Sequence, residues 1–402
     1  MKILLALFLI TAAKGVFAQV PPELMAEGAV VMDYLTGRVL YEKEGDVYRA
    51  PASMTKLITL YLGCEAVEKG DFALDTPVTV TEGGSAFSRP EGSSLMLLEE
   101  GQVLDYLTLL QGIAVSSGND GAYQLAELVA GNSDDFVGRM NLLVYSMGYE
   151  QMYFEDPDGW SENNRVSPVS YADFSRHYIE AFPWALEQLH SVKELTYPKE
   201  ENMAPGGQIQ SSRTKKNTNW LLGKVEGVDG LKSGYIDESG FNFAATAQRG
   251  ETRLITVVMG IFPEHYWEGL EIRAAESEAL LEYGFSHWET QPLPDFSVPV
   301  KVYSGEEEEI SLIPEEIPLF TYGEAELDRL TRTWETDDWL RAPLEQGTVG
   351  GRIVWYFDGE PVGEADLVSE RDVKKGAFFH NFIDLFEILF YNISHDKKQG
   401  EE

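Results

Sequence analysis

Three short segments of the sequence combine nucleophilic, basic and amide side chains that could carry out acyl transfer. In the first, S-M-T-K, Ser53 and Lys56 are separated by three positions at the start of a helical pattern. Residues i and i+3 share one helix face, so the hydroxyl and the amine can meet. A serine hydroxyl needs an adjacent base, and lysine can be that base where burial leaves it neutral. The same pattern also suits a helix N-cap serine followed by an exposed lysine.

The other two segments follow in order along the chain. The segment S-G-N, with Ser117 and Asn119, offers a hydroxyl that can relay a proton and an amide that can hold a peptide group. Alternatively, it is a loop and a helix cap. The segment K-S-G contains Lys232 and Gly234, which point the same way on a strand, and the missing side chain of Gly234 lets a ligand lie close. For this segment the alternative is a turn with a solvated lysine. The occurrence of all three segments in this order favours a single catalytic site.

Hydrophobic periodicity predicts the elements that must position these segments. Helical patterns cover 54–67, 103–115, 119–130, 168–181 and 274–283, while 29–41 is typical of a hairpin and 253–260 of a buried strand. Gly284 is expected to end the helix over 274–283. Helices and strands therefore mix through a domain that we place at 24–284. Cys64, the only cysteine, is interpreted as a small buried side chain, and an intrachain disulfide is excluded.

The composition changes after residue 284. Residues 286–372 are rich in proline, glutamate and short β-type runs, such as 298–300, 310–313 and 353–357, and predict a small β-rich domain. From 376 to 394 apolar residues form a broad helical face and polar residues form the opposite face. Acidic residues within this segment make spanning a bilayer costly, so we expect an amphipathic helix in the membrane interface. A helix packed on the β-rich domain is the alternative.

Residues 1–18 are typical of a signal peptide. Lys2 provides a short positive region, an apolar run follows, and permissive residues precede Gln19. The alternative, a core helix, fits the extreme N-terminal position less well. No other run approaches the ~20 apolar residues of a spanning helix. We therefore expect an exported protein, held peripherally on the outer face of the cytoplasmic membrane by residues 376–394.

The chain is strongly acidic. Its 402 residues include 31 Lys and Arg against 67 Asp and Glu, so the net charge is −36. A field of this sign repels phosphate backbones, which argues against nucleic acid as a partner. Hydrophobic residues make up 44% of the chain, which is enough for a folded core and argues against a disordered protein.

The three segments, in this order, form the S-x-x-K, S-x-N and K-[TS]-G signature of penicillin-binding proteins and serine β-lactamases. Their contexts, PASMTKLIT, SSGNDGAYQLAE, VDGLKSGY and the late LRAPLEQGTVG, resemble those of the low-molecular-weight penicillin-binding proteins, which are serine-type D-alanyl-D-alanine carboxypeptidases. The resemblance extends from about residue 24 to the C-terminus. It implies an α/β (α+β) penicilloyl-serine transferase fold, with an antiparallel sheet flanked by helices, the small all-β domain and a terminal anchor helix. It implies no metal and no cofactor.

The resemblance also implies catalytic roles. Ser53 would attack the carbonyl between the two terminal D-alanines of a peptidoglycan stem peptide, and Lys56 would take its proton. Ser117, with Lys232, would pass a proton to the leaving D-alanine, and water would then release the acyl-enzyme. β-Lactams would acylate the same serine as covalent inhibitors. Lys56 would act in its neutral form, because burial and the nearby Lys232 would lower its pKa.

Substrate binding is implied for the other residues of the signature. Asn119 would hydrogen-bond the backbone of the acyl portion, and Lys232 with the Ser233 hydroxyl would recognise the free carboxylate. The backbone N–H groups of Ser53 and Tyr235 would form the oxyanion hole. Preorganised donors of this kind stabilise the tetrahedral intermediate of acyl transfer.

Two departures from the family pattern affect carboxylate recognition. Ser233 replaces the threonine of many relatives, which keeps the hydroxyl and loses a methyl group. Thr218 stands where relatives often carry arginine between two asparagines, so a basic residue is missing. Arg213, Lys215 and Lys216 are the candidates in the sequence to replace that charge.

Three other functions are compatible with parts of this pattern. DD-endopeptidase activity on cross-links would use the same residues with a longer acceptor side, although the β-rich domain and terminal helix favour the carboxypeptidase. A β-lactamase typically deacylates with a glutamate in an E-x-x-L-N loop, and the chain has no Leu-Asn pair. A non-catalytic wall-binding protein would be expected to lack Ser53 or Lys56, and both are present.

Overall fold

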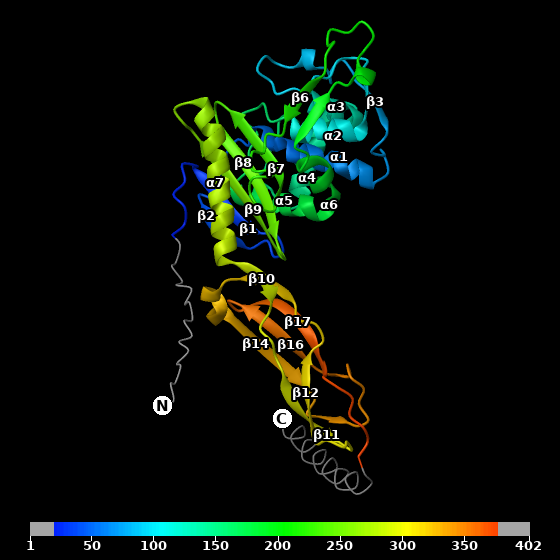
Figure 1. Cartoon of the computed structure of the whole chain (residues 1–402), viewed down its shortest axis with the longest axis vertical. Helices are drawn as coiled ribbons and strands as arrows, with labels where there is room; N and C mark the ends of the chain where they lie inside the picture. The colour runs from blue at the N-terminus through cyan, green and yellow to red at the C-terminus, as the bar shows by residue number, and fades with distance from the viewer. Residues whose placement is uncertain (1–19, 377–402) are drawn as a thin grey trace, which may run out of the picture.

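The structure, a computed structural model, describes residues 20–376 (Figure 1). The segment interpreted as a signal peptide lies outside the described residues, as does the expected amphipathic helix beyond residue 376. Across residues 20–376 there is no helix with the length and hydropathy needed to cross a bilayer. In Figure 1 the chain forms two parts, one of helices packed on a sheet and one made mainly of strands.

An antiparallel five-stranded sheet forms the centre of the first part, in the order β2-β1-β9-β8-β7. Its strands are β1 (Gly28–Asp33), β2 (Val39–Lys43), β7 (Val228–Ile236), β8 (Gly240–Arg249) and β9 (Thr252–Ile261). Successive side chains of a strand point to opposite faces, so these apolar strands need cover on both sides. β7 forms one edge of the sheet and pairs with β8. Its outer edge presents backbone groups to which a peptide can add as a further strand.

Helices cover both faces of this sheet. On one face lies α7 (Tyr266–His287), whose Leu280 packs with Val31 and Phe243. The helices toward the other face (Figure 1) are α1 (Lys56–Glu68), α2 (Tyr106–Val115), α3 (Asn119–Ala130), α4 (Ser133–Ser146), α5 (Pro168–Ala181) and the short α6 (Pro183–Ala185). Their apolar side chains form a second core with Val30 and Val257 of the sheet.

Short elements complete the first part. They are the 3-10 turns η1 (Ala52–Thr55), η2 (Ala86–Ser88) and η4 (Glu200–Asn202), the π turn η3 (Leu186–His190), and two small sheets, β3 (Pro77–Thr79) with β4 (Val103–Asp105) and β5 (Glu194–Tyr197) with β6 (Arg213–Lys216). The edge strand β7 packs against both η1 and η3. The turn that carries Ser53 therefore lies against the open edge of the central sheet.

The second part is a β-rich domain. Its elements are β10 (Glu289–Pro292), β11 (Val298–Tyr303), β12 (Glu309–Pro314), β13 (Leu319–Tyr322), β14 (Leu330–Thr336), β15 (Trp339–Arg341), β16 (Val349–Phe357), β17 (Glu360–Ser369) and the 3-10 turn η5 (Glu324–Arg329). Six strands form a sheet in the order β14-β16-β17-β12-β11-β15, and β10 pairs with β13. Leu312, Ile353 and Trp355 lie in its own apolar core.

Hydrogen bonds join the two parts where β13 meets the central sheet. Thr321 Oγ1 donates to the fully buried Asp33 Oδ1 at 2.7 Å, and Arg38 Nη1 donates to the backbone oxygen of Thr321 at 2.8 Å. Arg38 also pairs with Glu326 and lies over the ring of Phe357, 4.3 Å from its centroid. These contacts fix the β-rich domain to the hairpin of β1 and β2.

Most predicted elements agree with the structure, and three differ in extent. The helix predicted over 54–67 begins within the 3-10 turn η1, and α1 covers Lys56–Glu68. The hairpin, the helices over 119–130 and 168–181 and the buried strand are confirmed. The helix predicted from residue 103 begins at Tyr106, because Asp105 caps it by accepting from the Thr108 N–H. The helix predicted to end at Gly284 is part of α7 and continues past it. A Cβ at Gly284 would lie 2.5 Å from Leu254 Cδ1, so this glycine permits close packing on the sheet.

Candidate active site

The first signature segment forms a tight turn at the edge of the sheet. Ser53 lies in η1 and Lys56 is the first residue of α1, and Lys56 Nζ donates to Ser53 Oγ at 2.8 Å. Ala52, just before the serine, has a φ of +50°, in the left-handed region that non-glycine residues seldom adopt. Gly159 permits this turn, since a Cβ there would lie 1.9 Å from Ala52 O. Such strained backbone clusters at functional sites.

Lys56 is fully buried and has two further acceptors. Its Nζ donates to Asn119 Oδ1 at 2.8 Å and to the backbone oxygen of Asp158 at 2.5 Å. Burial lowers the pKa of Lys56 to about 8, against the opposing effect of nearby carboxylates, of which Asp158 is the strongest. The lowering that we expected from Lys232 is not among the main causes. A lysine with this pKa is neutral often enough, at mildly alkaline pH, to accept a proton.

The second and third segments meet through one hydrogen bond. Lys232 Nζ donates to Ser117 Oγ at 3.0 Å and to the backbone oxygen of Ser233 at 2.9 Å. Lys232 is only 1% exposed, and its pKa lies well below the usual value. Burial is the largest cause, and the positive charges of Lys56 and Arg273 lower the pKa further. Ser117 is held with a φ of +55°, a second strained position at the same site. The structure thus brings all three signature segments together.

The remaining signature residues lie on the edge strand beside the serine turn. A Cβ at Gly234 would lie 2.4 Å from Pro51 O and 3.0 Å from the backbone nitrogen of Ser53. Gly234 is therefore needed so that β7 can pack against η1, which is a different reason from the ligand approach expected from the sequence. Ser233, which precedes it, is 4% exposed. Tyr235 follows Gly234 directly on β7.

Comparison with known proteins identifies the family. Residues 15–262 match the D-alanyl-D-alanine carboxypeptidase family, and residues 295–375 match the C-terminal domain of penicillin-binding protein 5. The chain is 30% identical to D-alanyl-D-alanine carboxypeptidase DacF of Bacillus subtilis, with 94% of each chain covered. The chain belongs to the D-alanyl-D-alanine carboxypeptidase family.

Solved structures of penicillin-binding proteins have the same fold as this carboxypeptidase-family chain. Penicillin-binding protein 5 from Haemophilus influenzae superposes with a TM-score of 0.67 at 30% identity, covering 89% of this chain and 100% of that one. A Listeria monocytogenes penicillin-binding protein in its ampicillin-bound form superposes with a TM-score of 0.55 at 26% identity, covering 66% of this chain and 100% of that one. The expected mixed fold of helices on an antiparallel sheet, with a separate β-rich domain, is confirmed.

Two buried aspartates lie at this carboxypeptidase-family site, although the sequence interpretation gave them no role. Asp120 accepts from the backbone N–H groups of residues 96–98, each at 2.9 Å, and so fixes that loop to the start of α3. Asp158 is 2% exposed, and burial raises its pKa to about 7 against the opposing charge of Lys56. The run D-P-D-G marks a turn in the sequence. Because Asp158 is 102 positions from Lys56 in the sequence, nothing local indicated that the two residues meet.

The sequence interpretation also gave no role to Arg273. This arginine lies beside Thr218, the position at which relatives often carry a basic residue. Arg273 of α7 donates from Nη2 to the backbone oxygen of Thr218 at 3.4 Å, and its side chain lies near the ring of Phe241. It is 6% exposed, and burial lowers its pKa to about 10. Within residues 20–376 no carboxylate pairs with it. A buried arginine with no carboxylate partner, close enough to lower the pKa of Lys232, adds positive charge beside the edge strand.

Proposed function

We propose that the chain is a serine-type D-Ala-D-Ala carboxypeptidase that removes the terminal D-alanine from peptidoglycan stem peptides and is acylated by β-lactams. The observation that carries the proposal is the hydrogen bond of 2.8 Å between Ser53 and the fully buried Lys56, whose pKa is lowered to about 8. Family membership supports the same reaction. The direct test is release of D-alanine from a stem pentapeptide by the purified protein.

Acylation begins with the proton of the nucleophile. Neutral Lys56 takes the proton from Ser53 Oγ, which forms a bond to the carbonyl carbon of the penultimate D-alanine. The negative charge on the carbonyl oxygen is stabilised by the backbone N–H groups of Ser53 and Tyr235. The closeness of β7 to the serine turn at Gly234 supports this placement of the two donors.

The intermediate then loses the terminal D-alanine. The carbonyl–nitrogen bond breaks, and the leaving amine takes a proton through Ser117, whose hydroxyl is hydrogen-bonded to Lys232 at 3.0 Å. Water hydrolyses the remaining ester, which restores the hydroxyl of Ser53 and leaves a carboxylate on the shortened peptide. In a β-lactam the amine stays attached after the ring opens. Asn119, already oriented by Lys56, has an amide group with which to hold the acyl portion.

The free carboxylate of the substrate is bound by side chains on and beside the edge strand β7. Lys232 and the Ser233 hydroxyl bind the carboxylate, and Arg273 adds the charge that an arginine at the position of Thr218 would supply. The hydrogen bond from Arg273 to the backbone oxygen of Thr218 supports this assignment.

Replacing Arg273 with glutamine is expected to raise the KM for a stem pentapeptide by about tenfold, with a much smaller change in kcat. Loss of an interaction with a charged group is worth about 1.5–3 kcal/mol, and 1.4 kcal/mol corresponds to tenfold in affinity. Steady-state kinetics of D-alanine release measure both constants. Arg273→Lys should recover part of the affinity, whereas Arg249→Gln, which removes a partly exposed arginine paired with Glu282, serves as the control. A fall in kcat with an unchanged KM would contradict carboxylate binding.

We further propose a location and a domain plan for the chain. Residues 1–18 act as a signal peptide, residues 24–284 form the catalytic domain, and residues 286–372 form the β-rich domain that positions it relative to the membrane or wall. Residues 376–394 form an amphipathic helix that holds the protein peripherally on the outer face of the cytoplasmic membrane. The hydropathy patterns of the two end segments support this plan.

Deleting residues 376–402 should release the protein from membranes without loss of D-alanine release in solution. The chain has a net charge of −36 and is repelled by anionic lipid. Burial of apolar side chains in the membrane interface must therefore provide the binding free energy. Sedimentation of membranes followed by an activity assay of both fractions measures the effect, and high salt alone should not strip the full-length protein. Sedimentation of the truncated protein with membranes, or its loss of stability and activity, would show that the helix belongs to the folded core.

A further inference from the structure

A buried histidine contacts the edge strand just before the third signature segment. His190, the last residue of η3, is fully buried, and its Nδ1 lies 3.2 Å from the backbone oxygen of Leu231 on β7. Its other ring nitrogen, Nε2, lies 2.9 Å from the hydroxyl of Tyr178 on α5, which is also fully buried. Leu231 directly precedes Lys232, whose Nζ donates to Ser117 Oγ. The mechanism proposed above assigns no role to this histidine.

The protonation state of His190 fixes the direction of its hydrogen bonds. A backbone oxygen can only accept, so Nδ1 carries the proton and donates to Leu231. Burial lowers the pKa of His190 to about 4 against the opposing effect of the hydrogen bond to Leu231, so the ring is neutral near pH 7. In a neutral imidazole the other nitrogen is an acceptor, so Nε2 accepts from the Tyr178 hydroxyl. Cys64 Sγ lies 3.8 Å from the same hydroxyl and can donate to it, so this buried chain of hydrogen bonds holds the ring in one tautomer.

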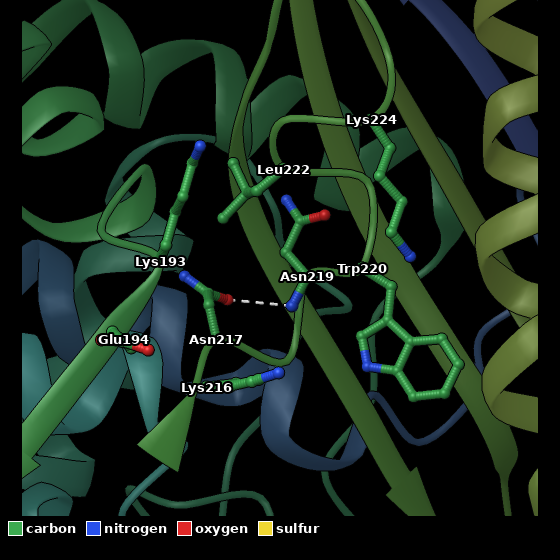
Figure 2. Close-up of a pocket in the computed structure, with 8 residues that line it drawn as sticks. All are labelled: Lys193, Glu194, Lys216, Asn217, Asn219, Trp220, Leu222 and Lys224. Carbon is green, nitrogen blue, oxygen red and sulfur yellow. Dashed lines mark hydrogen bonds between the residues drawn. The ribbon is translucent and has the colours of Figure 1, made fainter. Parts of the chain in front are cut away.

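Two asparagines hold the same stretch of the edge strand. Figure 2 shows Asn217 and Asn219 joined by a hydrogen bond, from the backbone nitrogen of Asn219 to Asn217 Oδ1 at 2.8 Å. Asn217 Nδ2 donates to the backbone oxygen of His190 at 3.0 Å, and Asn219 Nδ2 donates to the backbone oxygen of Gly230 at 2.9 Å. Two successive carbonyl groups of β7 are therefore held from outside the sheet, one by Asn219 and the next by the ring of His190.

The edge strand needs such contacts because the sheet fixes it on one side only. β7 pairs with β8, and its opposite edge has no neighbouring strand in the central sheet. A Cβ at Gly230 would lie 3.2 Å from Leu186 Cδ2 and 3.6 Å from His190 Cβ, so η3 packs closely on the start of β7. The turn η3 therefore fixes β7 two residues before Lys232.

We propose that His190 is a positioning residue for Lys232. By holding the carbonyl group of Leu231, the neutral imidazole fixes the backbone next to Lys232 and keeps its amine within hydrogen-bond distance of Ser117. Tyr178 acts through His190, because its hydroxyl sets the tautomer that donates to Leu231. The inference rests on the proposed function, in which Ser117 and Lys232 pass a proton to the leaving amine.

The position of Lys232 is constrained by two acceptors at once. Its Nζ donates to Ser117 Oγ at 3.0 Å and to the backbone oxygen of Ser233 at 2.9 Å. Misplacement of a catalytic group by about 1 Å can cost about 10²-fold in rate. Removing one restraint on β7 should cost less than this, because pairing with β8 and the hydrogen bond from Asn219 remain.

The test measures the rate of acylation by a fluorescent penicillin in variants of the full-length protein. His190→Phe keeps a planar ring, removes the donor to Leu231 and should slow acylation by about tenfold. His190→Asn keeps an N–H donor close to the position of Nδ1 and should recover much of the rate. Tyr178→Phe removes only the hydroxyl and should slow acylation by about threefold, since it acts one step further away. Its matched control, Tyr106→Phe, removes a buried hydroxyl that donates to the backbone oxygen of Gly63 in α1, and should leave the rate unchanged.

A second background separates positioning of Lys232 from a general loss of stability. In a Lys232→Gln protein the group that His190 positions is gone, so adding His190→Phe should slow acylation further by less than about twofold. The extent of labelling at long times gives the fraction of folded, active protein in each variant, so rates are compared per active site. Where His190→Phe does not fold, Tyr178→Phe replaces it in both backgrounds and is judged in the same way.

Three results would overturn the positioning role. They are an unchanged rate in His190→Phe, an equal slowing with and without Lys232, and a rate for His190→Asn as low as that for His190→Phe. Failure of the wild-type protein to be labelled would instead overturn the proposed function.

Discussion

Replacing Ser53 with alanine is expected to abolish both covalent labelling by a fluorescent penicillin and release of D-alanine, with the fold left intact. The substitution removes the only atom that can form the acyl-enzyme in the proposed mechanism, Ser53 Oγ, which accepts from Lys56 at 2.8 Å. Loss of a nucleophile of this kind costs about 10⁴-fold or more in rate. Gel fluorescence and a D-alanine assay measure the two losses, and mass spectrometry of the wild type should find the penicilloyl group on the peptide that contains Ser53.

The control is Ser146→Ala, which removes an exposed hydroxyl at the end of α4 and should leave both activities unchanged. Thermal unfolding of Ser53→Ala should match that of the wild type, because Ser53 is only half-buried and its backbone contacts with β7 remain. An adduct on Ser117 or Ser233 in the wild type would contradict the assignment of the nucleophile. D-alanine release by the alanine variant near the wild-type rate would contradict it as well.

The part of the site that could be predicted from the sequence is the part set by short-range geometry. The spacing of Ser53 and Lys56 places both on one helical face, and the structure joins them as expected. The roles of the other segments came only with the family resemblance, since nothing local indicates that Lys232 meets Ser117 across 115 positions. Burial of Lys56, which lowers its pKa, is likewise a property of the assembled fold.

The residues that were missed act across the fold. Arg273 is on the helix that covers the face of the sheet away from α1, and it reaches Thr218 over 55 positions. The candidates chosen from the sequence, Arg213, Lys215 and Lys216, were near in the chain, which is a weak guide to proximity in space. Only packing of α7 against β8 and β9 brings the buried arginine to this edge.

The same distinction applies to the elements. Periodicity predicted α3 and α5 within their observed limits, because the pattern of apolar side chains on one helix face is a local signal. Gly284 was interpreted as a helix stop signal. In the structure the glycine is needed for another reason, because the helix packs closely at this position against Leu254 on a strand of the central sheet. A glycine in a sequence does not reveal whether it serves a turn or a close contact. The order of the strands in the β-rich domain is also set by long-range pairing, which the short apolar runs do not specify.

Between pH 6 and 10, replacing Lys56 with arginine is expected to slow acylation most at the alkaline end, by about 10³-fold where wild-type Lys56 is neutral, a loss within the range for removal of a general base. Arginine keeps the positive charge and the length of the side chain but does not lose its proton in this range, so it cannot take the proton of Ser53. In the wild type the acylation rate should rise with pH through about 8, because the fraction of neutral Lys56 increases as pH passes its lowered pKa. Stopped-flow labelling with a fluorescent penicillin measures the rate for both proteins across this range.

Lys69→Arg is the matched control, because Lys69 lies just after α1 and pairs with Glu65 on the surface. It should keep both the wild-type rate and its rise with pH. Burial favours the neutral amine of Lys56, the carboxylate of Asp158 favours the charged one, and burial has the larger effect. A rate that rises with pH is therefore the result expected if neutral Lys56 is the base. Acylation at a normal rate by Lys56→Arg, or a wild-type rate that falls as pH rises through 8, would show that another group takes the proton. Lys232, whose pKa burial also lowers and which already contacts Ser117, would then be the base to test.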